Sequence, residues 1–502
     1  MPRSVLPTAL FVAAAVSLGF AAPAPGQGVV DLKPYRMESK APPNNWSVQL
    51  GELRTGKLKT AGPNLEANKA LFRQVAQFFV NKCTFEQYYV IPDAGELRPR
   101  TNEQVFDSVL KDLEAWLLIP SFDGSNFTPD QGDYIREFGA ALDEAIVAVL
   151  AKDPPPVIRV NAGRLLALAA RTGAPAHYPT ITKLLTNTFP FRGKPAPTPP
   201  ELLLAALRAA EGVLAAPDPV WQFINGPARY RHTLGEEELI PFVKLLQELA
   251  VKGPSGVAEK AAPPVEARLP AGQPAPKAAA GDKPPAKGGE LQASVLTPEQ
   301  VAVLRYYRRA AVRALAKVRP DKLGGGKTPV IRPAYTLAQI AVSDSSIALP
   351  PTVPEMAEAV LGLCGVAPTQ DLNVNELLTV IAQGTFRVVQ GRNDPDAVVN
   401  KSVPWRLYAA RYAQALARVR AGTKSNPRLL PHAAAINGLA DVIASDVIAP
   451  LDKFDPDKPE SSRPSSEGLL NWLNNRSAAA GGNRSLYTDD PKFVLNPRPP
   501  GQ

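Results

Sequence analysis

The sequence predicts an all-α protein, and three observations support this fold class. The 502-residue chain contains 54 prolines and abundant alanine but only 7% aromatic residues. This composition suits alanine-rich helices separated by proline turns better than strands, which favour β-branched and aromatic residues. Apolar residues recur at helical spacing in most segments, and such segments follow one another in pairs. Hydrophobic residues make up 45% of the chain, which is enough for the cores of two or three domains.

The N-terminus predicts export. Arg3 gives a positive start, the stretch from Val5 to Ala22 is almost entirely apolar, and small residues follow, as in a secretory signal peptide. We therefore expect residues 1–28 to be a signal peptide and the mature chain to be soluble in the periplasm or outside the cell. The alternative is an uncleaved membrane anchor. No later segment is expected to cross a membrane.

The next part of the chain predicts a lead-in and a first helical lobe. Residues 29–63 are polar and proline-rich, so we expect an extended segment in which Trp46 docks onto the helices that follow. Residues 64–252 predict the N-terminal lobe, with one short extended stretch at Phe85–Pro99. From their apolar stripes and end signals, the helices expected in this lobe are Asn64–Cys83, Thr101–Leu117, Thr128–Leu150, Val157–Gly173, Tyr178–Thr186, Glu201–Ala215 and Gly235–Val251.

One helix pair in this lobe carries a more specific pattern. The helix ending at Leu150 is followed by Asp153, a run of prolines, and then Val157-Ile158-Arg159 at the start of the next helix. This unit resembles a HEAT-type repeat. The resemblance implies antiparallel helix pairs stacked into an irregular α-α superhelix, an α-solenoid, in which Asp153 and Arg159 form a structural ladder between neighbouring units.

A linker and a second lobe follow. Residues 253–293 consist of Pro, Ala, Lys and Gly with almost no large apolar side chains, so they cannot bury a core and predict a disordered linker. Residues 294–452 predict the C-terminal lobe, and residues 453–502 a mostly disordered tail in which only the cluster Leu469–Leu473 forms a helix that docks back. The helices expected in the second lobe are Leu304–Arg319, Pro354–Gly362, Val374–Gln383 and Trp405–Arg420, with an apolar helix before Ser445.

The second lobe also contains an internal echo. Residues 304–319 align with residues 405–420 at an offset of 101. After each copy come a polar turn, a proline segment, an apolar helix and a Ser-Asp pair, at Ser343-Asp344 and at Ser445-Asp446. This predicts a duplicated multi-helix unit. The tetrapeptide Pro-Val-Ile-Arg ending at Arg332 repeats the one ending at Arg159, which predicts the same local geometry at both places.

No catalytic, cofactor-binding or metal-binding constellation is expected. The glycine-rich stretch Gly324–Thr328 lacks the first glycine and the strand of a phosphate-binding loop, and predicts a helix C-cap turn instead. Ser108 and Lys111 have the spacing of penicillin-binding enzymes but lack the partner motifs, and the three histidines are far apart. Cys83 and Cys364 are the only thiols. They could form a disulfide bond after export or remain buried and unpaired.

The remaining candidate site is a basic helix. Arg305, Arg309, Arg313 and Lys317 are spaced by four on one helical face, and Arg308 widens the stripe. Such a stripe could hold an acidic polysaccharide, a membrane surface or an acidic partner, or it could be a solvated or internally paired face.

The sequence therefore predicts a non-enzymatic, exported scaffold that binds an unknown protein partner through stacked helix hairpins. An envelope anion-binding protein is the first alternative, and an enzyme whose site is assembled from distant residues is the second. The net charge of +9 is modest for this length, so we do not expect nucleic-acid binding.

Overall fold

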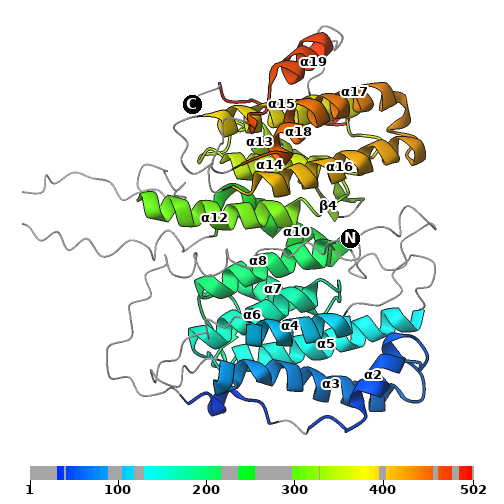
Figure 1. Cartoon of the computed structure of the whole chain (residues 1–502), viewed down its shortest axis with the longest axis vertical. Coiled ribbons are helices and arrows are strands. Elements are labelled where there is room, and N and C mark those ends of the chain that lie inside the picture. The colour runs from blue at the N-terminus through cyan, green and yellow to red at the C-terminus, as the bar shows by residue number, and fades with distance from the viewer. Residues whose placement is uncertain are drawn as a thin grey trace, which may run out of the picture. The chain divides into compact units, whose positions relative to one another are not determined.

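The computed structural model describes residues 31–38, 41–88, 104–117, 129–215, 236–254, 297–326, 328–394, 403–455, 462–477 and 485–499. This part of the chain is all-α, as the sequence predicts, with two short antiparallel strand pairs added (Figure 1). The predicted signal peptide, 1–28, and nearly all of the predicted linker, 253–293, lie outside the described residues.

The chain divides into two compact units, Met1–Gly235 and Glu236–Gln502. The sequence predicts the division at the linker, with residues 236–252 in the first lobe, and the contacts of these residues correct that boundary. Helix α10 (Glu236–Lys252) packs on α12 and α13 of the second unit. Its Gln247 donates from Nε2 to Thr336 Oγ1 at 2.8 Å, so polar as well as apolar contacts hold the helix there.

The first unit is a stack of helices in which α3 packs on α5, α5 on α6, and α6 on α8. Gly163 of α6 allows close approach, because a Cβ atom there would lie 2.6 Å from the Cβ of Ala205 on α8. The helical elements of this unit are η1 (Lys33–Tyr35), α2 (Trp46–Arg54), α3 (Leu65–Asn81), η2 (Lys82–Thr84), η3 (Glu86–Tyr88), α4 (Gln104–Leu117), α5 (Pro129–Leu150), α6 (Pro156–Ala170), α7 (His177–Leu185) and α8 (Pro200–Ala215), and strands β1 (Pro190–Phe191) and β2 (Lys194–Pro195) form a hairpin.

The predicted lead-in is helical in part rather than extended, because it contains η1 and α2. Trp46 does dock as expected: its ring centroid lies 6.1 Å from that of Phe78 and 5.4 Å from that of Trp116. Of the stretch expected to be extended, Glu86–Tyr88 forms the short helix η3, and residues 89–99 lie outside the described part.

The helix pair that resembles a HEAT-type repeat forms α5 and α6, which pack against each other. Arg159 pairs with Asp153 at 3.2 Å, and Asp153 adopts a positive φ of 51° in the turn between the helices. Arg159 also binds Glu201 of α8 at 2.7 Å. The pair therefore has a structural role, with a glutamate of a following helix as the second partner.

The second unit is built around α14, which packs on α12, α13 and α15. Capping boxes begin α12 and α14: Thr297 with Gln300, and Thr352 with Glu355. The remaining elements are α12 (Pro298–Leu315), β3 (Leu323–Gly325), β4 (Thr328–Ile331), α13 (Pro333–Ala341), α14 (Val353–Leu363), α15 (Val374–Asn393), α16 (Trp405–Ser425), η6 (Leu430–His432), α17 (Ala433–Ile443), the π-helical turn η7 (Ala444–Ile448), α18 (Ala449–Asp452) and α19 (Glu467–Ser477).

The internal echo holds for the first helix of each copy and for the apolar helix that follows, α13 in one copy and α17 in the other, but it fails at the connection between them and at the Ser-Asp pair. Both aligned segments are helical, in α12 and α16, and the aligned Tyr307 and Tyr408 are both buried. The first copy then forms the β3–β4 hairpin, where the glycines 324–326 have positive φ, and not the expected helix C-cap. The first Ser-Asp pair lies in a turn with Ser343 at φ 52°, whereas the second lies inside η7.

The C-terminal region is more ordered than predicted. Helix α19 docks through the fully buried Leu469 against α15 and α17, as expected. Residues 485–499, expected to be unstructured, are also described, and Leu486 and Tyr487 have no exposed surface. Their anchoring is the main feature that the sequence did not predict.

Among the described residues, one later segment is long and apolar enough to cross a membrane, contrary to expectation. Residues Leu430–Asp452 form 23 residues of continuous helix with a mean hydropathy of 1.4, and 33% of the most apolar window is buried. A single helix of this kind is weak evidence for a membrane span, since helices of soluble proteins meet the same criteria. Here α18 and η7 pack against α16.

Candidate partner-binding site

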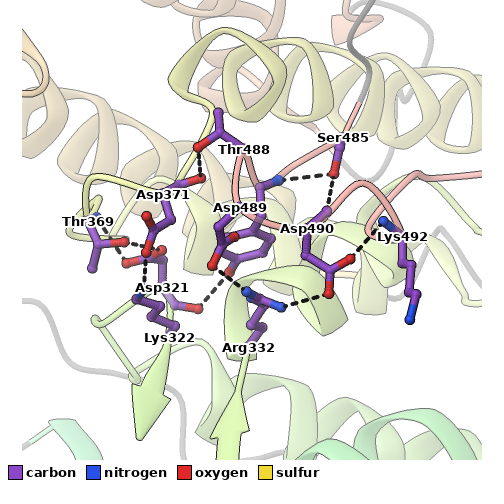
Figure 2. Close-up of polar contacts among 11 residues, drawn as sticks. Asp321, Lys322, Arg332, Thr369, Asp371, Ser485, Thr488, Asp489, Asp490 and Lys492 are labelled. Atoms are coloured by element: carbon purple, nitrogen blue, oxygen red, sulfur yellow. Dashed lines mark hydrogen bonds and ion pairs between the residues drawn. The ribbon is translucent and has the colours of Figure 1, made fainter. Parts of the chain in front are cut away.

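The most elaborate polar site in the described part of the chain holds residues 485–499, which we call the tail segment. The surface on which it packs, which we call the tail groove, consists of Asp321, Arg332, α13, the turn at 343–347 and the loop at 366–373. Figure 2 shows the polar contacts at one end of this groove. The tail segment folds back on itself through an antiparallel bridge between Ser485 and Val494 and then continues in extended form to Arg498.

Arg332, at the end of β4, is the centre of the site. Its guanidinium carbon lies 4.5 Å from the centroid of the Tyr487 ring and 4.2 Å from that of Phe493. The same group binds Asp489 at 2.8 Å and approaches Asp490 at 3.7 Å. Because only 12% of the Arg332 side chain is exposed, these ionic and cation–π contacts are less screened by water than surface pairs.

The backbone of the tail segment is held as firmly as its side chains. Asn373 donates its amide to the carbonyl of Leu486 at 2.9 Å, and Thr488 donates its amide to the carbonyl of Asp371 at 2.8 Å. These bonds flank an antiparallel bridge between Leu372 and Tyr487. Such contacts resemble addition of a strand to an exposed edge, and they do not depend on side-chain identity.

The hydroxyl of the buried Tyr487 has a hydrogen-bond partner. This hydroxyl donates to the carbonyl oxygen of Asp321 at 2.7 Å. Burial raises the pKa of Tyr487 above its usual range, so the hydroxyl stays protonated. The carboxylate of Asp321 accepts from the amide and hydroxyl of Thr369, both at 3.0 Å. Burial raises the pKa of Asp321, and the bonds from Thr369 oppose that shift.

The far end of the tail segment is anchored at the turn after α13. Ser345 donates its amide to the carbonyl of Asn496 at 2.9 Å, and Arg498 donates its amide to the carbonyl of Ser343 at 3.1 Å. The amide of Asn496 donates to Oδ2 of the buried Asp344 at 2.6 Å. Between the two ends, Tyr335 donates to the carbonyl of Val494 at 3.1 Å.

The tail groove thus combines an aromatic and cationic pocket with sequence-independent backbone anchors. Such a surface can recognise an extended peptide that presents aromatic and acidic residues. The sequence indicates Arg332 only as part of a repeated tetrapeptide and does not predict its acidic and aromatic partners. A signal was present, because Leu486-Tyr487 and Phe493-Val494-Leu495 are apolar runs in an otherwise polar tail.

The predicted basic stripe on α12 is largely turned inward. Arg308 is fully buried, where it donates to the carbonyl of Leu349 at 2.9 Å and lies 3.4 Å from Glu355, which is also fully buried. Burial lowers the pKa of Arg308, and the charge of Glu355 opposes that shift. Arg308 therefore cannot widen a surface stripe.

Two further members of the stripe belong to a second buried network around Glu358. Arg309 donates to the Tyr408 hydroxyl at 2.8 Å, and Arg313 lies 3.7 Å from Glu358. Arg411 binds the same carboxylate through two bonds of 2.8 and 2.6 Å. Burial acts to raise the pKa of Glu358, but the bonds and charge of Arg411 outweigh it and keep the pKa low. Of the alternatives left open for the basic stripe, the structure therefore supports an internally paired face.

The last two members of the stripe, Arg305 and Lys317, are half-buried. The described residues therefore do not form the continuous, solvated cationic ridge that binding of a polyanion would need. The basic helix loses its main support as a binding site.

Both cysteines are buried and neither is part of a disulfide bond, with Cys83 in the first unit and Cys364 in the second. The disulfide that the sequence left open is not formed. Burial raises the pKa of both thiols, to about 12 for Cys364, so neither is a reactive thiolate at neutral pH.

One buried histidine has a carboxylate partner. His177 Nδ1 lies 3.0 Å from Asp143 Oδ1, and Thr180 donates to the other oxygen of that carboxylate at 2.8 Å. Because His177 has no exposed surface, no substrate can reach it in this conformation. Within the described ranges, no group of three or more His, Cys, Asp or Glu side chains is arranged to hold a metal ion.

Comparison with known proteins gives no relative: no family model, no curated protein and no solved structure matches the chain.

Proposed function

We propose that the protein is a non-enzymatic, exported scaffold that binds a partner protein through the tail groove. The partner would contribute an extended segment with an aromatic residue followed by acidic residues, as in Tyr487-Thr488-Asp489-Asp490. The tail segment would then be an intramolecular occupant that competes with the partner.

The observation that carries the proposal is the environment of Arg332. The guanidinium lies against two neighbouring aromatic rings and faces two carboxylates, and all four partner groups lie more than 150 residues away in the chain. Specific recognition of a linear segment is therefore within the chemistry of this surface. The backbone anchors supply affinity, and the Arg332 pocket supplies selectivity.

A tail that can leave its groove is a requirement of this proposal. Two features of the contacts favour release. The acidic anchors Asp489 and Asp490 are about one-third exposed, at 36% and 32% of their side-chain surface, so salt weakens their pairing with Arg332. The segment also reaches the groove from α19 through residues 478–484, so its detachment would leave α19 in place.

The test is binding of a synthetic peptide with the sequence of residues 485–499 to a chain truncated after Ser477. We expect saturable binding by fluorescence anisotropy, which weakens with salt and is reduced at least tenfold by Arg332→Ala. Arg418→Ala is the matched control, because Arg418 is an exposed arginine of α16 outside the groove. Circular dichroism verifies that the truncated chain keeps its helices.

Absence of binding to a folded truncated chain would contradict the proposal. Equal binding of a peptide in which both aspartates are replaced by asparagine would contradict the acidic specificity. If truncation unfolds the second unit, the same peptide carrying a label is exchanged into the full chain. Failure to displace the tail segment in hydrogen exchange would then count against the proposal.

A further inference from the structure

A second surface of the second unit has a different chemistry. Helix α16 and the stretch α17–η7 enclose a surface groove of about 520 Å³, within the roughly 300–1,000 Å³ of small-molecule sites. From α16 the groove is lined by Ala413, Leu416, Ala417 and Ala421, and from the facing stretch by Ala440, Ala444 and Ile448. Apart from its two cations, the lining is entirely aliphatic.

The cations lie at one end. Arg420 and Lys424 complete the lining and belong to the last turns of α16, whereas Ala413 marks the other end. The stretch from Ala413 to Lys424 rises about 16 Å along the helix axis. The groove therefore has a cationic end, and the rest of its length is aliphatic. It is complementary to a ligand with an anionic head group and a single aliphatic chain.

The availability of the two cations differs. Arg420 binds Asp441 of α17, whose side chain is 73% exposed. Lys424 is exposed and forms no ion pair with another described residue. Because exposed pairs contribute little, a ligand carboxylate can engage Lys424 directly and compete with Asp441 for Arg420.

Two properties of the facing wall support an apolar ligand. The continuous helix Leu430–Asp452 is the most apolar long helix in the described part, yet only 33% of its apolar window is buried. Ala444 and Ile448 enter the groove from the π-helical turn η7, and π-helical turns occur frequently at functional sites. The wall thus offers aliphatic surface that the fold itself leaves uncovered.

We infer that the α16–η7 groove binds a free fatty acid, with the acyl chain along the alanine trough and the carboxylate at Lys424 and Arg420. Burial of methylene groups supplies most of the affinity, and the cations select the ionised head group. This inference does not depend on the proposed partner-binding function, because the two surfaces share no residue.

The test uses the full chain and tetradecanoate below its micelle concentration, with displacement of a fluorescent fatty acid as the readout. We expect saturable one-site binding. Tetradecan-1-ol, which has the chain without the charge, should bind about tenfold more weakly.

Four variants locate the site. Ala417→Phe fills the trough and should weaken binding at least tenfold, whereas Ala410→Phe, at an exposed position of α16 outside the lining, should change it less than twofold. Lys424→Glu should weaken binding about tenfold, whereas Arg418→Glu, also exposed on α16 and outside the lining, should not.

Removal of the acid that competes for Arg420 should increase the affinity for the fatty acid, unlike the other variants. Asp441→Asn should tighten binding two- to threefold, because Arg420 no longer has an intramolecular partner. Equal binding to Ala417→Phe and Ala410→Phe, or equal binding of tetradecanoate and tetradecan-1-ol, would overturn the inference. Absence of any saturable binding to the folded full chain would overturn it as well.

Discussion

The same tetrapeptide, Pro-Val-Ile-Arg, occurs twice and adopts two conformations. Residues 156–159 form the first turn of α6, with Pro156 at the first helical position. Residues 329–331 lie in strand β4, and Arg332 directly follows the strand with φ −126° and ψ 82°. Local sequence therefore does not determine local geometry here, and the neighbouring residues explain the difference.

The decisive neighbour is the residue after the arginine. Pro333 follows Arg332, and a proline disfavours the helical region for the residue before it. The helix α13 accordingly begins at Pro333. Arg159 is followed by Val160, so α6 continues. In addition, three glycines at 324–326 with positive φ turn the chain into a hairpin before Pro329.

Both arginines nevertheless reach two acids, with unequal consequences. Arg159 connects the turn residue Asp153 to Glu201 within a helical stack, and Arg332 holds a segment more than 150 residues away. In one case the arginine strengthens contacts that the helices make anyway. In the other it is a main anchor of a segment that has no regular secondary structure of its own.

The largest expected effect is that of Arg332→Ala. Loss of the two aromatic contacts and the ion pairs should destabilise the second unit by about 3 kcal/mol. Amide hydrogen exchange should then increase throughout residues 485–499. Arg332→Lys, which keeps the charge and loses the planar group, should give an intermediate result. Unchanged protection of the tail in Arg332→Ala would remove the contrast between the two arginines.

Arg159→Ala should have a smaller effect, about 1–2 kcal/mol in urea unfolding, because it removes two ion pairs, whereas Arg332→Ala also removes two aromatic contacts. Exchange should rise only at the α5–α6 turn and the start of α8. A loss of unfolding free energy as large as that of Arg332→Ala would show that the ion pairs of Arg159 stabilise the helices of the first unit more than the apolar contacts do.

Pro333→Ala tests the reason for the two conformations. We expect a destabilisation of about 0.5–1 kcal/mol, because the unfolded chain gains freedom and Arg332 is no longer excluded from the helix. The matched control is Pro156→Ala, where no preceding arginine can change conformation. Chemical shifts of residues 330–333 that move toward helical values in Pro333→Ala alone would support this explanation.

The smallest effect concerns pH. The folded pKa of Asp321 is raised by burial, so its contribution to stability is present below its unfolded pKa and is lost as pH rises through the raised value. The free energy of unfolding of the natural chain should therefore fall relative to that of Asp321→Asn as pH rises above about 4. A difference that does not vary with pH would contradict this assignment.

The sequence was sufficient for features that depend on local spacing. Helical stripes predicted α3 to α8 and α12 to α16. Docking of Trp46 and Leu469 also followed from sequence, because large apolar side chains in polar surroundings need a buried partner. Composition predicted the fold class, because abundant alanine favours helices and strands favour β-branched and aromatic residues.

The spacing of residues along the sequence could not predict the binding surface. The stripe of Arg305 to Lys317 has the spacing of a surface face, and only the positions of Glu355 and Glu358 on another helix turn its members inward. Likewise, no local pattern indicates that Asp489 and Phe493 meet Arg332. Such pairings depend on tertiary packing.

The sequence by itself determined that this chain folds into amphipathic helices, because a helix bonds each residue to one four positions away and needs only local information. Tertiary structure alone decided which charges are exposed, which acids meet which arginines, and that the C-terminal segment lies in a groove. The physical reason is that burial and ion pairing depend on distances between groups far apart in the chain, which residue spacing does not encode.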